Sequence, residues 1–377
     1  MPPRKDELEE RYEMWWKGEG AVLQVTVSNP PRVPRTVRDV GWLLAHVAEG
    51  WVKEGESPDW DWIWETYRSW WKGFYYGGDS YPQVWLNLGP GAMAAYLDGY
   101  ASFRGDTVWF ELPEPLGWEE IGRLDYDPEN PWWRFTLEAA HELGSRARED
   151  GVVLGTADIG GVHDVLASLR GTGNMMTDFY DHPEELRREG ERFLALWHRY
   201  YDELDDVISL YQDGRDAWMH IYSSLRWYPI QCDLAYMLSP DMFREFVLPV
   251  LEGHCRRLER TIYHLDGVGQ LVHLEYLLDI PELTGIQWVP GAGKPTCGDP
   301  CWFPYYRRIR EKGKLLVLGG VHPGQLEGLM EAIRPEGVLI SVQVEDLGTA
   351  REVERKFRRW AGGRKSLQDP RKGGTLS

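Results

Sequence analysis

The sequence predicts an α/β protein built as a single (β/α)8 TIM barrel. Three observations favour this fold class. The chain has 377 residues, a length that one barrel accommodates. It contains eight short apolar runs, rich in β-branched or aromatic residues, as expected of strands that are buried on both faces. Longer helix-like segments lie between the runs, and eight alternating units close a barrel.

The eight apolar runs are the predicted strands. An open doubly wound sheet is the alternative arrangement, but no glycine-rich phosphate-binding sequence follows the first run. In chain order the predicted strands cover 22–27, 84–88, 152–157, 217–222, 261–265, 285–289, 315–319 and 338–343.

The clearest predicted helix covers 183–201, with a proline at its first position and apolar residues at helical spacing. A second helix is predicted over 239–258, with Ser239 as the N-cap and Pro240 at the first turn. A third is predicted over 323–333, directly after a strand. Helices in these positions connect parallel strands.

One domain is predicted for residues 1–361, because no change in composition divides this part of the chain. The segment 104–112 has the pattern of an extra strand or hairpin inserted after the second strand. Residues 362–377 are rich in Gly, Lys and Arg and are predicted to be a flexible tail.

The composition excludes several classes of protein. A formal net charge of −18 argues against nucleic-acid binding, which needs a basic surface. No apolar run is long enough to cross a membrane. Four cysteines do not make a disulfide framework, and no secretory signal is visible, so a cytoplasmic protein is expected. The 20 tryptophans indicate either an aromatic core or a pocket that stacks on a flat substrate.

Titratable residues follow several of the predicted strands, where the active site of a TIM barrel lies. His264 and Asp266 are two residues apart on an extended chain, so their side chains point to the same face. A histidine beside a carboxylate suits proton transfer or metal binding, although the pair could also only orient a loop. Asp158 and Asp233 are the other predicted catalytic residues, since each follows a strand.

Five further residues near strand ends are predicted to bind substrate. Arg170 could hold a carboxylate or phosphate, or it could form an ordinary salt bridge. Trp288 could stack on a flat ligand. Asn87, Gln287 and Tyr222 add hydrogen-bonding groups, and the set is therefore Arg170, Asn87, Trp288, Gln287 and Tyr222.

A metal site is a further possibility at the same end of the barrel. His264 and Asp266 would be its first ligands, and Cys232 and His322 are additional candidates. Cys232 could equally be a small buried hydrophobic residue. Cys297 and Cys301 form a single C-x3-C pair, which is at most half of a zinc site.

The segment TIYHLDGVGQLVHLEYLLDIPELTGIQWVPGAGKP resembles the uroporphyrinogen decarboxylase superfamily, in its uncharacterised "uroporphyrinogen decarboxylase-like" branch. The block LSPDMFREFVLP is similar to one shared by the decarboxylases and the corrinoid-linked methyltransferases. Other matching stretches are WWKGEG, YGGDSYPQVWLNLGPG and DIGGVHDVLASLRG. The resemblance extends over roughly residues 10–360 and implies a (β/α)8 barrel.

The resemblance also implies one of two activities. The decarboxylases remove carboxylates from a tetrapyrrole without a cofactor, and bind them through two N-terminal arginines that WWKGEG lacks. Their relatives move methyl groups between corrinoid proteins and thiols, using zinc held by a histidine and two cysteines. Where those enzymes have His-x-Cys, this chain has His264-Leu265-Asp266. A homodimer is also expected from the resemblance.

Three functions follow as hypotheses. The first is methyl transfer from a small O- or N-methylated substrate to a corrinoid or folate acceptor, with zinc as a possible metal and a corrinoid protein as a possible partner. The second is cofactor-free decarboxylation of an aromatic or pyrrolic acid. The third is a non-catalytic protein that binds a corrinoid or another flat ligand.

Overall fold

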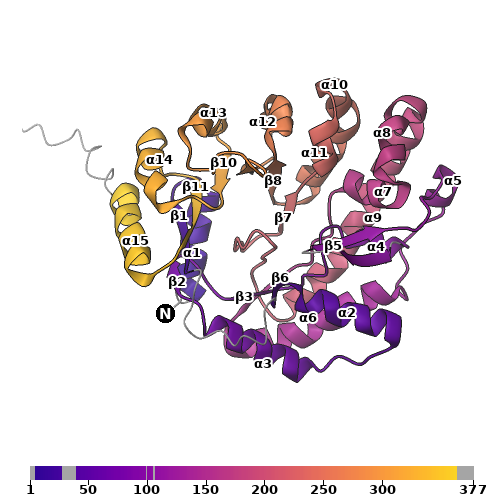
Figure 1. Ribbon diagram of the computed structural model, residues 1–377, viewed down its shortest axis with the longest axis horizontal. Coiled ribbons are helices and arrows are strands. Elements are labelled where there is room, and N and C mark those ends of the chain that lie inside the picture. The colour runs from indigo at the N-terminus through magenta and orange to yellow at the C-terminus, as the bar shows by residue number, and fades with distance from the viewer. Residues whose placement is uncertain (1–4, 28–39, 99, 105–106, 363–377) are drawn as a thin grey trace, which may run out of the picture.

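A seven-stranded sheet forms the centre of the computed structural model, which describes residues 5–27, 40–98, 100–104 and 107–362 (Figure 1). Its strand order is β2-β1-β11-β10-β9-β8-β7, and all neighbours are parallel except β2, which pairs antiparallel with β1. The strands are β1 (Val22–Val27), β2 (Tyr76–Gly78), β7 (Trp227–Ile230), β8 (Arg260–Asp266), β9 (Gly285–Val289), β10 (Leu315–Leu318) and β11 (Val338–Val344).

Two small sheets complete the strand pattern. β3 (Gln83–Trp85) and β6 (Val153–Gly155) form a parallel pair, and β4 (Tyr100–Arg104) and β5 (Thr107–Glu111) form an antiparallel hairpin. The hairpin lies where an insertion after the second strand is predicted. Within the described residues no hydrogen-bonded ladder joins β7 to β6 or β3 to β1, so the closed barrel is not confirmed. One reason is visible at β1, because β2 occupies the edge that β3 would need.

The predicted strand 217–222 is wrong. His220 has a positive φ of 58°, and its backbone N–H donates to the carbonyl of Ala217, so the segment turns instead of extending. The strand forms later, as β7, despite Pro229 within it. Most residues of 217–222 are apolar because they pack in a buried cluster in the interior, and not because they pair with neighbouring strands.

Helices surround the sheets, and in Figure 1 those from α11 to α15 follow one another around the outside of the large sheet. The predicted helix 183–201 is part of α9, and Ser239 caps the predicted helix 239–258 by accepting from the N–H of Met242. 3₁₀ turns include Asp233–Met237 and Pro323–Gln325, and a π turn lies at Phe243–Val247. The α-helices are α1 (Lys5–Trp16), α2 (Leu43–Glu54), α3 (Trp60–Trp71), α4 (Met93–Leu97), α5 (Trp118–Ile121), α6 (Pro131–Asp150), α7 (Val162–Arg170), α8 (Thr172–Asp181), α9 (Pro183–Ser209), α10 (Pro240–Met242), α11 (Leu248–Arg257), α12 (Leu274–Leu278), α13 (Phe303–Glu311), α14 (Leu326–Ala332) and α15 (Leu347–Gly362).

Both parallel sheets face a common interior whose floor is apolar. Strand residues from six different strands pack in one buried cluster with Trp15 and Trp16 of α1 and with Met219 and Tyr222 of the turn that precedes β7. These strand residues are Val22, Val153, Trp227, Ile262, Leu315, Val317 and Leu339. Because α1 and the 217–222 segment fill this end, the interior can open only toward the carboxyl ends of the strands.

At the next inward position several strands carry a polar residue, whereas β10 carries Val317. Side chains on one face of a strand recur every second residue, so Gln24 follows Val22, His264 follows Ile262, and Ser341 follows Leu339 on the inner face. Gln24 pairs with Ser341, and His264 pairs with Gln287, in the strand register. The interior therefore changes from apolar to polar toward the carboxyl ends of the strands.

None of the helices in the described parts of the chain is both long and apolar enough to cross a membrane. The predicted tail 362–377 lies, apart from Gly362 at the end of α15, outside the described residues. The single-domain prediction for 1–361 stays a prediction.

Candidate active site

Three aspartates lie where neighbouring parallel strands end. Asp158 follows β6, Asp233 follows β7, and Asp266 is the last residue of β8. The carboxyl ends of parallel strands meet at the same edge, so the fold brings these acids toward one another. His264 lies one inward position before Asp266 on β8.

His264 is held by hydrogen bonding and by an aromatic contact. Its Nδ1 lies 2.5 Å from the amide oxygen of Gln287, and its ring edge contacts Trp218 with ring centroids 5.0 Å apart. An amide oxygen only accepts, so Nδ1 carries the hydrogen and Nε2 is free to accept a proton. Nε2 is 3.9 Å from a carboxylate oxygen of Asp266.

Asp233 lines two of the cavities that are described below. The surrounding protein reduces the hydration of its carboxylate and so raises its pKa. A charged His264 opposes the rise, and the Asp266 carboxylate adds to it. Although Asp233 as a whole is exposed, its carboxyl can therefore keep a proton at a higher pH than an aspartate without these neighbours does.

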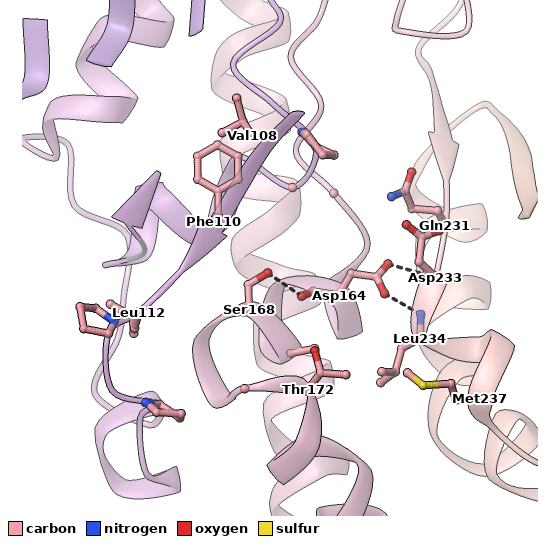
Figure 2. A pocket seen from close by; sticks show the side chains of 17 residues that line it. Val108, Phe110, Leu112, Asp164, Ser168, Thr172, Gln231, Asp233, Leu234 and Met237 are labelled. Carbon is pink, nitrogen blue, oxygen red and sulfur yellow. Dashed lines mark hydrogen bonds between the residues drawn. The ribbon is translucent and has the colours of Figure 1, made fainter. Parts of the chain in front are cut away.

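Asp164 is a member of the site that was not among the predicted catalytic residues. It lies in the first turn of α7, and its two oxygens accept the backbone N–H groups of Asp233 and Leu234, each at 2.9 Å (Figure 2). Burial and the nearby Asp233 carboxylate raise the pKa of Asp164. Because like charges repel, the Asp233 carboxylate makes Asp164 harder to ionise.

Asp158 lies deeper in the protein. Its Oδ1 accepts from the backbone N–H of Gly160 at 3.0 Å and lies 3.3 Å from the hydroxyl of Tyr228. Burial raises the pKa of Asp158 to about 7, and repulsion from Asp233 adds to the rise. The fold thus brings the four predicted catalytic residues, Asp158, Asp233, His264 and Asp266, into one electrostatically connected group, although their roles stay predictions.

Two cavities meet at Asp233. The outer cleft, of about 570 Å³, lies between the β4–β5 hairpin, α7 and the turn Asp233–Met237. Figure 2 shows Val108 and Phe110 on one wall of it, and Asp233 and Leu234 on the other. A smaller cavity of about 330 Å³ lies between Asp233, Asp266 and Lys294. Small or apolar residues line much of the outer cleft, among them Pro90, Gly91, Ala167, Gly171 and Met237.

The inner pocket is a third cavity, of about 270 Å³, at the polar level of the interior. It lies beside the His264–Gln287 pair, because Gln287 is one of its lining residues. His264 lines none of the three cavities, but it contacts Gln287 and Trp218 of the inner pocket and lies 3.9 Å from Asp266, which lines the smaller cavity.

Of the five residues predicted to bind substrate, some lie beside a cavity and others do not. Gln287 contacts His264 and lines the inner pocket. Arg170 donates to Asp178 at 2.8 and 3.3 Å, which is the salt-bridge alternative, and it lines none of the three cavities described above. Asn87 donates to the carbonyl of Gly41 and accepts from the N–H of Gly89.

The two remaining predicted substrate residues are aromatic and buried. Trp288 packs against Trp302 with ring centroids 5.1 Å apart. Tyr222 lies in the apolar floor, where its carbonyl accepts from the indole N–H of Trp16. Neither side chain lines one of the three cavities.

The predicted metal ligands do not assemble. Among the described residues no group of three or more His, Cys, Asp or Glu side chains is placed to hold a metal ion. Cys232 is buried, which raises the pKa of its thiol far above the ordinary value. His322 is exposed, and its Nδ1 accepts from the N–H of Gly324. The described residues do not fit a zinc site built from His264, Asp266, Cys232 and His322.

The C-x3-C pair is split between two environments. Cys297 is buried, and its thiol donates to the carbonyl of Trp288 at 3.3 Å, whereas Cys301 is exposed. Both thiols are free. This geometry gives the pair no common function.

Comparison with known proteins gives a match in structure alone. No family model matches the chain, and no curated protein sequence does. A solved methyltransferase from Methanosarcina mazei is similar in structure, with a TM-score of 0.57 and 14% identity, over 93% of this chain and 98% of that one. At this identity the likeness shows a shared fold, and membership of the uroporphyrinogen decarboxylase superfamily stays a prediction.

Proposed function

We propose that this chain is a methyltransferase with a TIM-barrel arrangement of its strands. It would remove the methyl group of a small O- or N-methylated molecule and pass it to a corrinoid or folate acceptor. The observation that carries this proposal is that His264 contacts Gln287 of the inner pocket and also acts electrostatically on Asp233, whose pKa is raised. The fold shared with a methyltransferase supports the choice of reaction.

Asp233 is the proposed general acid. When the methyl–oxygen bond breaks, its electron pair stays on the oxygen, and an alkoxide leaves poorly near neutral pH. A protonated Asp233 gives its proton to that oxygen while the methyl group bonds to the nucleophilic atom of the acceptor. The raised pKa of Asp233 keeps the proton available for this step.

Asp164 and Gln287 position the reacting groups in this proposal. Asp164 fixes the loop that carries Asp233 through two backbone hydrogen bonds. Gln287 holds the imidazole of His264 through Nδ1, and Nε2 lies 3.9 Å from Asp266. Nε2 can then take up or return a proton through Asp266. No step is routed through zinc, because the described ligand set does not fit it.

The charge of the site disfavours decarboxylation. Among the described residues that line the outer cleft, the neighbouring smaller cavity or the inner pocket, Lys294 is the one lysine and there is no arginine. Arg170, the predicted carboxylate clamp, is engaged by Asp178. A substrate carboxylate would therefore find few cationic side chains among these lining residues to balance its charge. A homodimer and a separate corrinoid protein remain predictions from the resemblance.

The proposal is tested by demethylation of a substrate panel. Purified protein is incubated with small methyl ethers and methylamines, and with reduced cobalamin or tetrahydrofolate as acceptor. Methylated acceptor and demethylated product are measured by mass spectrometry. At least one panel member should react, and Asp233→Asn should lower its rate about 100-fold or more, the usual size of a general-acid effect.

Asp241→Asn is the matched control, because Asp241 lies on α10 and forms an exposed pair with Arg244. It should react at the wild-type rate. The proposal fails if no panel member reacts above the protein-free background. The role of Asp233 fails if Asp233→Asn and Asp241→Asn have equal activity.

A further inference from the structure

The inner pocket differs from the usual interior of a parallel barrel, which large branched apolar side chains fill. Here Gln24, Thr26, Gln287 and Ser341 line an open space of about 270 Å³ together with the apolar side chains of Trp218, Met219, Val317 and Leu339. That space corresponds to roughly nine water molecules. A cavity of this size and polarity can hold a molecule with few non-hydrogen atoms.

Hydrogen-bonding groups line the inner pocket without filling it. The indole N–H of Trp218 is buried and has no hydrogen-bond partner among the described residues. The amide oxygen of Gln287 is engaged by His264, so its NH₂ is the end that remains to donate. Thr26 and Ser341 add hydroxyl groups. A buried donor without a partner is costly, so a polar occupant that accepts these hydrogen bonds is favoured.

The pocket is also neutral. His220 and Tyr76 are its titratable lining residues. Burial lowers the pKa of His220 to about 4 and raises the pKa of Tyr76, so both are uncharged near pH 7. The outer cleft, by contrast, contains Asp164 and Asp233. Without a countercharge among these described lining residues, an ion of either sign that loses its hydration is penalised.

We propose that the inner pocket is a binding subsite for a small neutral molecule, or for the neutral end of a larger one, that bears hydroxyl, ether or amide groups. The inference rests on the proposed function insofar as the occupant is the methylated substrate, with its methyl group directed toward His264. The bulky acceptor then uses the outer cleft, which has about twice the volume.

Gly319 gives a variant that blocks the pocket with little strain. It lines the inner pocket, its φ is not positive, and a Cβ added there meets no atom within 4 Å. Gly319→Leu should fill the cavity and leave the fold intact. Gly328→Leu is the matched control, because Gly328 is exposed on α14 and also meets nothing within 4 Å.

The test is ligand-observed NMR with five probes at millimolar concentration. Acetamide, ethylene glycol and 2-methoxyethanol are neutral, acetate is an anion, and methylammonium is a cation. With wild type and Gly328→Leu, signals of at least one neutral probe should be attenuated, and Gly319→Leu should abolish the effect. Thr26→Val, which keeps the volume, should weaken that binding roughly threefold to tenfold through loss of one hydrogen bond.

Two outcomes overturn the inference. The first is that the probes displaced by Gly319→Leu are acetate or methylammonium. The second is that no probe distinguishes wild type from Gly319→Leu while circular dichroism shows both folded. Since the assay needs no turnover, binding that depends on Gly319 without demethylation would refute the proposed function and leave the subsite standing.

Discussion

Asp158→Asn should remove a large part of the pH dependence of folding stability. The ordinary pKa of an aspartate is 3.8, and burial raises that of Asp158 to about 7. Between these values the folded chain binds a proton that the unfolded chain does not. The free energy of unfolding therefore falls as pH rises through this window, by about 4 kcal/mol in total at about 1.4 kcal/mol per pH unit. Above pH 7 this contribution is constant.

The assay is urea unfolding of wild type and Asp158→Asn at pH 5.5 and pH 8. An asparagine has no charge to bury, so the variant should gain about 2 kcal/mol relative to wild type between these two pH values. The prediction concerns this change with pH, because the amide also alters the hydrogen bonds to Gly160 and Tyr228. Parallel stability curves for the two proteins would refute the raised pKa.

Asp216 provides the matched control. It is equally buried, burial raises its pKa to about 7, and a tyrosine hydroxyl, that of Tyr81, donates to it at 2.7 Å. Neither aspartate lines the outer cleft or the inner pocket, but Asp233 adds to the raised pKa of Asp158 and is not among the groups that shift the pKa of Asp216. Asp216→Asn should repeat the stability effect without altering the pH–rate profile, whereas Asp158→Asn should alter both. Equal effects of the two variants on the rate would remove Asp158 from the site.

Three further predictions concern separate parts of the molecule. Gln287→Glu places a carboxylate beside Nδ1 of His264, and this negative charge favours the imidazolium form. The pH–rate profile should therefore move to higher pH by about one unit, and an unmoved profile would refute the contact. Lys314→Met removes an ammonium that donates to the carbonyls of Ile280, Pro281 and Leu283, and urea unfolding should show a loss of about 3 kcal/mol, with a loss under 1 kcal/mol contradicting the buried contacts. Wild type and His264→Ala should contain equal zinc by elemental analysis, and zinc lost only from the variant would show that His264 is a ligand.

The parallel strands could be predicted where apolar sequence and strand pairing coincide, as in β1, β8 and β9. The segment 217–222 shows the limit of this rule, since its residues are apolar because they fill the floor of the interior. An apolar pattern in the sequence indicates that the residues are buried. It does not distinguish residues that form a strand of a sheet from residues that pack against the sheet. For the same reason, nothing in the sequence indicated that hydrogen bonding between β6 and β7 would be missing in the described part of the chain.

The candidate site divides in a similar way. The His264–Asp266 pair follows from spacing alone, because both residues lie on one strand. Asp164 could not be found from spacing, since its partners Asp233 and Leu234 lie about 70 residues away on another loop. The one local sign is Gly161, where a Cβ would lie 2.4 Å from an Asp164 oxygen and from the carbonyl of Gln231. A glycine that permits such an approach can be interpreted only when the second loop is known.

The contrast between the inner pocket and the outer cleft constrains the direction of the proposed reaction. A neutral substrate seated in the inner pocket presents its methyl-bearing atom at the level of His264, and the raised pKa of Asp233 places a proton on the cleft side. The proton from Asp233 and the methyl acceptor then approach the substrate from the same side. The proton must therefore reach the leaving atom at an angle to the line along which the methyl group is transferred. This geometry excludes substrates whose leaving atom is enclosed by the inner pocket. Among neutral molecules that fit the pocket, those with a terminal methoxy group should react, and those with the same group in the middle of the chain should bind without reacting.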